Sequence, residues 1–226
     1  MCKVVSVSVI LMLVLSIAPI TLHAESSWVL SSEEMGINVY YKTRDSSPFN
    51  LVRAQMDIDV GLDQLAKIMR DIPNYNKWMF GCVRSDVLAR TSEFDFTLYY
   101  VHETPWPFNY RDVVLSIKAT DGLQEGWFTV EMEAVDNTYT LDEDYVRMAE
   151  MIGKWRFESI GEKVSRVTFI LVVDPAGDVP TMFVNTGKEK VVFESFLGLK
   201  GQALGAGFEK DMERYRSEKI EEYDSI

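Results

Sequence analysis

The stretch from Leu51 to Val60 alternates between apolar and polar residues, and this period of two restricts the fold more than any other feature. Every second residue from Val52 to Val60 is apolar, and the residues between them are polar or charged. Successive side chains of a strand point to opposite faces of a sheet, so one face of this segment is buried and the other is solvated. The stretch therefore predicts a half-buried antiparallel strand.

Segments of strand character make up most of the remaining chain and are bracketed by two helical segments. Residues 62–71 carry apolar residues at helical spacing and end before Pro73, and a long helical pattern runs from about residue 180 to 215. Runs of strands with segregated helices predict an α+β domain in which a curved antiparallel sheet wraps around the C-terminal helix. The other strands are predicted at residues 28–30, 37–42, 83–89, 94–102, 111–119, 127–135, 146–159 with a break near Gly153, and 164–173.

Residues 1–24 have the pattern of a secretory signal peptide. A short basic start at Lys3 precedes an apolar run, and Ala24 supplies the small residue of a cleavage site. The alternative is a membrane anchor, for which the apolar run is at the short limit of what a bilayer requires. We therefore expect an exported protein, periplasmic or secreted, with residues 25–226 as one domain.

The composition excludes several classes of protein. The chain has 226 residues, and the loss of 24 would leave 202 residues with 22 basic and 35 acidic side chains, a net charge of −13. Cys82 and His102 would be its only cysteine and histidine, too few for a disulfide scaffold or a Cys/His zinc site. The acid excess argues against a nucleic-acid partner. With no base or basic cluster beside it in the sequence, Cys82 is expected to be a buried apolar residue.

Signatures of enzyme chemistry are missing from the sequence. It contains no Gly-x-Ser-x-Gly elbow, no phosphate loop and no dinucleotide fingerprint. His102 is the one candidate base, and a strand-end or surface position explains it more simply than catalysis. Asp57, Asp59 and Asp63 superficially resemble a calcium loop, but the bidentate glutamate is absent. We therefore expect no catalytic residues, no cofactor and no metal, and a binding function instead.

Six motifs occur in the order found in one family, between Trp28 and Met212. Together they make the chain resemble the START family (steroidogenic-acute-regulatory-protein-related lipid transfer domains), as an exported, bacterial-type, single-domain member. The motifs are Gly36-Ile37-Asn38-Val39-Tyr40 for "GI-x-VY", the helix end from Asp71 to Trp78, Tyr99-Tyr100 with Pro105-Trp106-Pro107, Asn109-Tyr110-Arg111-Asp112 for "RD", Val146-Arg147 with Gly153-Lys154-Trp155 for "VR … G-x-W", and Thr168 to Asn185 for the "DP-x-G-x-(I/V)P … VN" segment.

The resemblance implies the helix-grip fold, with a hydrophobic tunnel between the sheet and the C-terminal helix. It implies one lipid or other apolar ligand in that tunnel, and it implies that the C-terminal helix and a neighbouring loop form the lid. Each candidate lining residue also has the simpler interpretation of an ordinary core residue. By position, the candidates are Trp78, Tyr99, Trp106, Met148, Trp155, Phe169 and Phe196.

Arg111 is the most informative polar candidate for ligand binding. The period of two places it on the apolar face of its strand with Val113, Leu115 and Ile117. An arginine on an apolar face needs a partner. Two interpretations stay open, namely a structural salt bridge to an unidentified carboxylate and a contact with the headgroup of a ligand.

The last helix is unusual in carrying Gly198, Gly201, Gly205 and Gly207. Each glycine costs about 1 kcal/mol in a helix interior relative to alanine. The helix is therefore expected to be loosened or interrupted. The glycines are either a hinge for a lid or sites of close helix–sheet packing.

Three functions follow from these observations. The first is a carrier of lipids or other apolar ligands that makes transient membrane contact. The contact is expected to be brief because the negative net charge would repel anionic lipid surfaces. A local basic patch near Lys188, Lys190 and Lys200 would reduce this repulsion. The second is an enzyme of the cyclase or hydrolase type on the same fold. The third is an envelope interaction protein whose cavity has no function.

Overall fold

One antiparallel sheet forms most of the molecule. The computed structural model describes residues 27–209 except 137, together with 212, 213 and 215, so the predicted signal peptide at residues 1–24 lies outside the described residues. The sheet has ten strands in the order β1-β2-β3-β10-β9-β7-β6-β5-β4, with the two-residue β8 pairing in parallel with β6. The strands are β1 Val29–Glu34, β2 Ile37–Arg44, β3 Ser47–Ile58, β4 Cys82–Arg90, β5 Asp95–His102, β6 Arg111–Gly122, β7 Trp127–Ala134, β8 Val146–Arg147, β9 Glu150–Gly161 and β10 Val164–Asp174.

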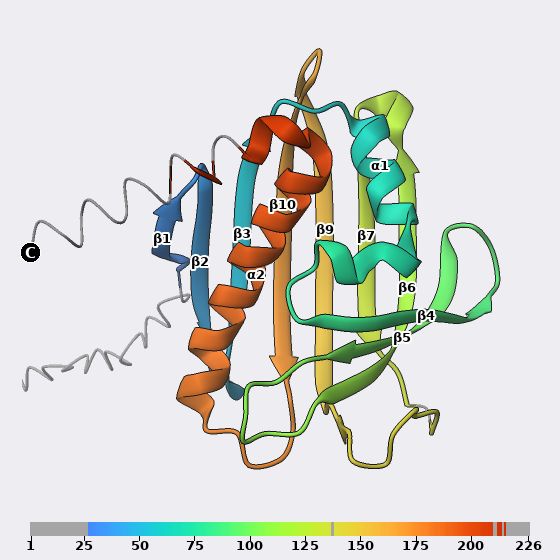
Figure 1. Ribbon diagram of the computed structural model, residues 1–226, viewed down its shortest axis with the longest axis vertical. Coiled ribbons are helices and arrows are strands. Elements are labelled where there is room, and N and C mark those ends of the chain that lie inside the picture. Colours follow the sequence, from blue (N-terminus) through green and yellow to red (C-terminus); the bar gives the residue numbers. More distant parts are fainter. Residues whose placement is uncertain (1–26, 137, 210–211, 214, 216–226) are drawn as a thin grey trace, which may run out of the picture.

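The sheet is strongly curved. Strands β4 and β5 run across the direction of β9 and β10, so that the end of the sheet folds over its own inner face (Figure 1). The long strands β9 and β10 form the middle of the sheet and link its N-terminal strands to β4–β7. This curvature creates the interior in which the candidate site lies.

Two α-helices cover the inner face. Helix α1, Leu62–Arg70, buries Leu62, Leu65 and Met69 at three- and four-residue spacing and continues into the 3-10 helix η1, Ile72–Lys77. A second 3-10 turn, η2, spans Leu123–Glu125. Helix α2, Thr181–Leu204, contacts β2, β3 and β10 and meets α1 near its C-terminal end (Figure 1). The fold is the predicted α+β helix-grip architecture.

One detail of the predicted elements is wrong. The break in the segment 146–159 occurs at Met148 and Ala149, whereas Gly153 lies within β9, where a Cβ atom would come within 2.8 Å of Met132. Gly153 is therefore a site of close packing inside the sheet. The helical pattern of residues 180–215 is interrupted, as its glycines predict, because α2 ends before Gly205, which has a φ of 58°. A helical conformation resumes at residues 206–209.

Candidate functional site

The interior beneath α2 is filled by stacked aromatic rings. The Trp155 ring lies parallel to Phe169 with centroids 4.0 Å apart, and it stacks on Phe196 from α2 at 5.5 Å. Trp78 meets the same tryptophan edge-on at 6.1 Å. Although Trp155 is fully buried, its Nε1–H has no hydrogen-bond partner among the described residues. The predicted residues Trp78, Trp155, Phe169 and Phe196 thus form one cluster.

A pocket lies beside this cluster, between α1 and the curled end of the sheet. It has a volume of about 250 Å³, and its surface is mainly apolar. Strands β4 to β7 and the 3-10 turns supply the wall opposite α1. The lining residues are Ala66, Met69, Arg70, Ile72, Tyr75, Arg90, Glu93, Phe94, Phe96, Ile117, Ala119, Thr120, Asp121, Leu123, Phe128 and Val130.

Sequence reasoning did not identify these lining residues. The period-two and helical patterns place Met69, Ile117 and Phe128 on buried faces but do not distinguish a packed face from a hollow one. None of the predicted tunnel candidates lines this pocket. One of them, Trp78, lines a smaller pocket of about 150 Å³ between α1 and the last turn of α2. A hydrogen bond of 2.7 Å from Gln64 Nε2 to the Ala203 carbonyl oxygen ties α1 to α2.

Arg111 is almost fully buried, at 3% exposed, and binds backbone carbonyl groups. Its guanidinium donates to the carbonyl oxygens of Pro175 at 3.3 Å and Ala176 at 3.4 Å, in the turn before α2, and to that of Asn109 in the β5–β6 loop. Burial lowers the pKa of Arg111 from its ordinary value. Among the described residues, the partners are thus carbonyl groups instead of the expected carboxylate, and a contact with a ligand stays a prediction.

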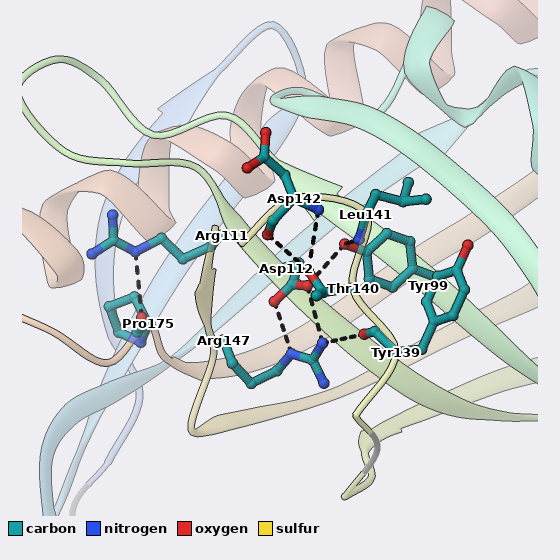
Figure 2. Close-up of polar contacts among 9 residues, drawn as sticks. All are labelled: Tyr99, Arg111, Asp112, Tyr139, Thr140, Leu141, Asp142, Arg147 and Pro175. Carbon is teal, nitrogen blue, oxygen red and sulfur yellow. Dashed lines mark hydrogen bonds and ion pairs between the residues drawn. The ribbon is translucent and has the colours of Figure 1, made fainter. Parts of the chain in front are cut away.

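Tyr99 and Asp112 form a polar cluster on the opposite face of the sheet (Figure 2). The Tyr99 hydroxyl donates to Asp112 at 2.8 Å and accepts from the Leu141 N–H at 3.1 Å. Arg147 donates to both carboxylate oxygens of Asp112, at 2.8 and 3.0 Å, and to the Tyr139 carbonyl oxygen. Burial raises the pKa of Asp112, but the hydrogen bonds from Arg147, Tyr99 and Thr140 outweigh burial, so the pKa is lowered.

The polar cluster corrects the prediction that Tyr99 lines the tunnel. Alternation along β5 directs Leu98 and Tyr100 toward the main core, whereas Tyr99 lies on the other face with Val101. There it holds residues 139–141 of the β7–β8 loop against the sheet. The signal for this arrangement was already present in the sequence, because the same period of two that was applied to Arg111 also applies to Tyr99.

Two further candidates have different surroundings. Trp106 is 92% exposed in the β5–β6 loop, so the prediction that it lines a tunnel is wrong. It sits between Pro105 and Pro107 on a loop that leaves the sheet, where no neighbouring strand covers it. Met148, by contrast, is buried in the main core, at the break between β8 and β9.

His102 and Cys82 face each other across β4 and β5. Burial, with a smaller effect from the charge of Arg111, lowers the pKa of His102 to about 4. Burial raises the pKa of Cys82 to about 11, so the thiol is protonated at neutral pH, as expected of a buried apolar cysteine. The pair thus combines a weak base with an unreactive thiol.

The surroundings of Gly198 and Gly201 decide between a hinge and close packing as the role of these glycines of α2. A Cβ atom on Gly198 would lie 2.0 Å from the carbonyl oxygen of Trp78, and one on Gly201 would lie 2.9 Å from the Phe208 ring. These two glycines serve close packing. Gly205, with its positive φ, interrupts the helix instead.

Comparison with known proteins assigns the chain to a family. The sequence pattern of the START domain matches residues 21–197. The chain belongs to the START domain family. A START domain of this kind accounts for the curved sheet and the long C-terminal helix, and it supports a role in binding hydrophobic ligands.

Relatives of this START protein come from bacteria and mammals. The STAR-related lipid transfer protein of Xanthomonas axonopodis, solved as a fragment, is 25% identical with a TM-score of 0.70, and the match covers 78% of this chain and 98% of that one. An uncharacterised protein of Pseudomonas aeruginosa is 25% identical over 78% of this chain and 86% of its own length.

Human START domain-containing protein 10 is 23% identical over 74% of this chain, which spans only 58% of that relative. The crystal structure of human STARD10 has a TM-score of 0.69 at 21% identity, covering 82% of this chain and 76% of that one, which shows a shared fold.

The described residues contain neither a cluster of metal ligands nor a membrane-spanning helix. No group of three or more histidine, cysteine or acidic side chains in this part of the chain is placed to hold a metal ion. Asp57, from the weak calcium pattern, instead forms an ion pair with Arg166 at 2.8 Å. No helix among the described residues is long and apolar enough to cross a membrane.

Proposed function

We propose that this START protein binds a lipid or another apolar molecule in its interior and carries or presents it within the cell envelope after export. The observation that carries the proposal is the mainly apolar pocket between α1 and the β4–β5 hairpin. Family membership and the bacterial lipid transfer protein of similar structure support it. Export rests on the signal pattern of residues 1–24.

The energetics of such a carrier require the pocket to match a bilayer. A chain of about 16 carbons gains roughly 13 kcal/mol on leaving water, at about 0.8 kcal/mol per methylene, and a membrane offers the same gain. Exchange is then limited by opening of the protein. The pocket of about 250 Å³ is smaller than the roughly 300–1,000 Å³ typical of ligand sites, so a whole lipid would require it to widen.

The lid of the carrier is proposed to be residues 206–209, which follow Gly205, and not the whole of α2. The middle of α2 cannot swing freely as a hinge, since Gly198 lies directly against Trp78. Gly205 interrupts the helix, and the segment after it folds back so that Phe208 packs against Gly201. The hydrogen bond from Gln64 to Ala203 closes the seam with α1. Opening at this seam would expose the smaller pocket beside Trp78.

Transient membrane contact is proposed at the end of the molecule where α2 begins. Trp106, Met182 and Phe183 are 92%, 70% and 60% exposed. They lie in two stretches, residues 104–110 and 179–187, that contain no charged residue although 26% of the chain is charged. Apolar and aromatic side chains without charged neighbours enter a bilayer interface at low desolvation cost. The acidic remainder of the protein would keep such contact brief on anionic membranes.

Arg111 is proposed to hold this surface together. Its carbonyl partners come from the β5–β6 loop, which carries Trp106, and from the turn that leads to Met182 and Phe183. The two segments lie beside one another at the lower end of the molecule in Figure 1. A buried guanidinium with five N–H donors is suited to joining several carbonyl groups.

Ligand binding is tested by native mass spectrometry of the protein purified from its own host, together with an assay of lipid transfer between vesicles. A retained lipid mass and transfer activity are expected. Ala66→Phe should fill the pocket and reduce both, whereas Asp63→Phe, which places the same ring on the exposed side of α1, should not. A protein that retains no lipid and transfers none would refute the proposal and favour the envelope interaction protein.

Membrane contact is tested by sedimentation with phosphatidylcholine vesicles. Trp106→Ala and Phe183→Ala should each weaken binding, whereas Ile160→Ala should not, although Ile160 is also an exposed apolar residue, at 46%. Equal loss in all three variants would contradict the assignment of this surface.

The enzyme alternative gains no support from His102 or Cys82, whose shifted pKa values make them a weak base and a protonated thiol.

A further inference from the structure

We propose that the pocket beneath α1 is a site for a single-chain amphiphile with an anionic head, and that Arg70 and Arg90 bind the head at the rim. This inference rests on the proposed function and specifies the chemistry of the occupant. The head would be a carboxylate or a phosphate, which share the negatively charged oxygens that guanidinium groups recognise.

The rim of the pocket brings the two arginines together from different elements. Arg70 is the last residue of α1, and Arg90 is the last residue of β4. Each guanidinium lies over an aromatic ring of the lining, Arg70 over Phe94 at 6.0 Å and Arg90 over Phe96 at 4.9 Å. The charged groups therefore stand directly above the apolar surface that would receive a hydrocarbon chain.

The present partners of the two arginines are weakly bound. Arg70 pairs with Glu93 at 3.3 Å, and both side chains are about half exposed, which makes the pair easily exchanged. Arg90 donates at 3.5 Å to the carbonyl oxygen of Glu93. An anionic head can displace the Glu93 carboxylate, which lies on the exposed turn between β4 and β5, without leaving a buried charge unpaired.

Asp121, the second acidic residue of the lining, should repel a bound anion less than Glu93 does. Asp121 accepts a hydrogen bond of 3.0 Å from the backbone N–H of Leu123, so its carboxylate is oriented toward the turn that follows β6. The remainder of the lining is predominantly apolar, including Met69, Ile117 and Phe128. The pocket thus combines a cationic rim with an apolar interior, as an anionic amphiphile requires.

The size of the pocket selects one chain. A volume of about 250 Å³ lies below the range of about 300–1,000 Å³ found for drug-sized ligands. A single hydrocarbon chain needs less widening than a two-chain phospholipid does. Met69, with its flexible side chain, lines the pocket and can adapt to chain length.

The test measures binding of four twelve-carbon compounds to the full chain below their micelle thresholds: dodecanoate, dodecyl phosphate, dodecanol and dodecyltrimethylammonium. Dodecanoate and dodecyl phosphate should bind more tightly than dodecanol, and the cation should bind most weakly. Arg70→Gln and Arg90→Gln should each weaken dodecanoate binding about three- to fivefold and change dodecanol binding by less than about twofold. Added salt should weaken the binding of dodecanoate but not of dodecanol.

Controls separate failure of this inference from failure of the proposed function. Arg166→Gln removes an exposed arginine from another part of the sheet and should leave every affinity unchanged. Ala66→Phe should weaken binding of all compounds if they occupy this pocket. Equal binding of dodecanoate and dodecanol, or no effect of either arginine variant in a protein with wild-type melting temperature, would overturn the head assignment while leaving the carrier function intact. If none of the compounds binds, the inference about this pocket fails, and lipid retention and vesicle transfer decide the carrier function separately.

Discussion

Replacement of Gly198 with alanine should destabilise the protein, whereas the same replacement at Gly187 should stabilise it. Both residues lie within α2, so both gain helix propensity on replacement by alanine. Their surroundings differ, because a Cβ atom on Gly187 would meet nothing within 4 Å, while one on Gly198 would lie 2.0 Å from the Trp78 carbonyl oxygen. The two variants therefore separate local propensity from tertiary packing.

The magnitude follows from the contact distance. A separation of 2.0 Å falls about 1.4 Å short of an ordinary contact at 3.4 Å, and the atom met belongs to the backbone, which cannot rotate away. Overpacking costs typically 1–3 kcal/mol, and the upper end applies here, offset by about 1 kcal/mol of helix propensity. We expect Gly198→Ala to lower the free energy of unfolding by about 2 kcal/mol and Gly187→Ala to raise it by about 0.5–1 kcal/mol.

The assay is thermal and urea unfolding of the two variants beside the wild type. For a domain of this size, 1 kcal/mol corresponds to about 2–4 °C in Tm, so Gly198→Ala should melt about 4–8 °C lower and Gly187→Ala about 1–4 °C higher. A Gly198→Ala protein as stable as the wild type would refute the inference that α2 is packed against Trp78 at this point. It would also restore the hinge interpretation of Gly198.

Three further predictions concern buried charged or titratable side chains. Asp112→Asn should lower the free energy of unfolding by about 2 kcal/mol at neutral pH, because it removes the carboxylate that Arg147 binds. Since the folded-state pKa of Asp112 is lowered, urea unfolding should show this difference in full above about pH 4 and a smaller difference as the pH falls through that lower pKa. His102 has a folded-state pKa of about 4 against an ordinary 6.5, so wild-type stability should decline as the pH falls from 6.5 to 4, and His102→Gln should remove that part of the decline; an identical profile in the variant would contradict this. Arg111→Leu should lower the free energy of unfolding by about 1–3 kcal/mol and weaken vesicle binding even where the protein remains folded, since the carbonyl groups that it joins lose their common donor.

Much of the fold could be predicted from local patterns. The alternation around Val52 to Val60 appears as buried and less buried residues in β3, and the helical spacing of residues 62–71 appears as α1. Such patterns report which side of an element is apolar, and burial of that side is what drives folding. The wrong break at Gly153 arose because a glycine in a strand signals either a break or a close contact, and only the neighbouring Met132 decides between them.

The candidate site was predicted less well. The cluster of Trp78, Trp155, Phe169 and Phe196 does come together around the interior, but Trp106 is on the surface. The partners of Arg111 could not be predicted, because Pro175 and Ala176 are 64 and 65 residues away in the chain and present carbonyl groups that every residue possesses.

By itself, the sequence determined the element types, their order, the α+β class and the family resemblance, because these depend on periodicity and on motifs along the chain. Only the tertiary structure decided where the interior is hollow. The pocket is formed by α1, η1, η2 and the strands β4 to β7, and its rim by Arg70 and Arg90, which are far apart in the extended chain. The curvature of the sheet brings them together, and curvature arises from strand pairing, which no single segment encodes.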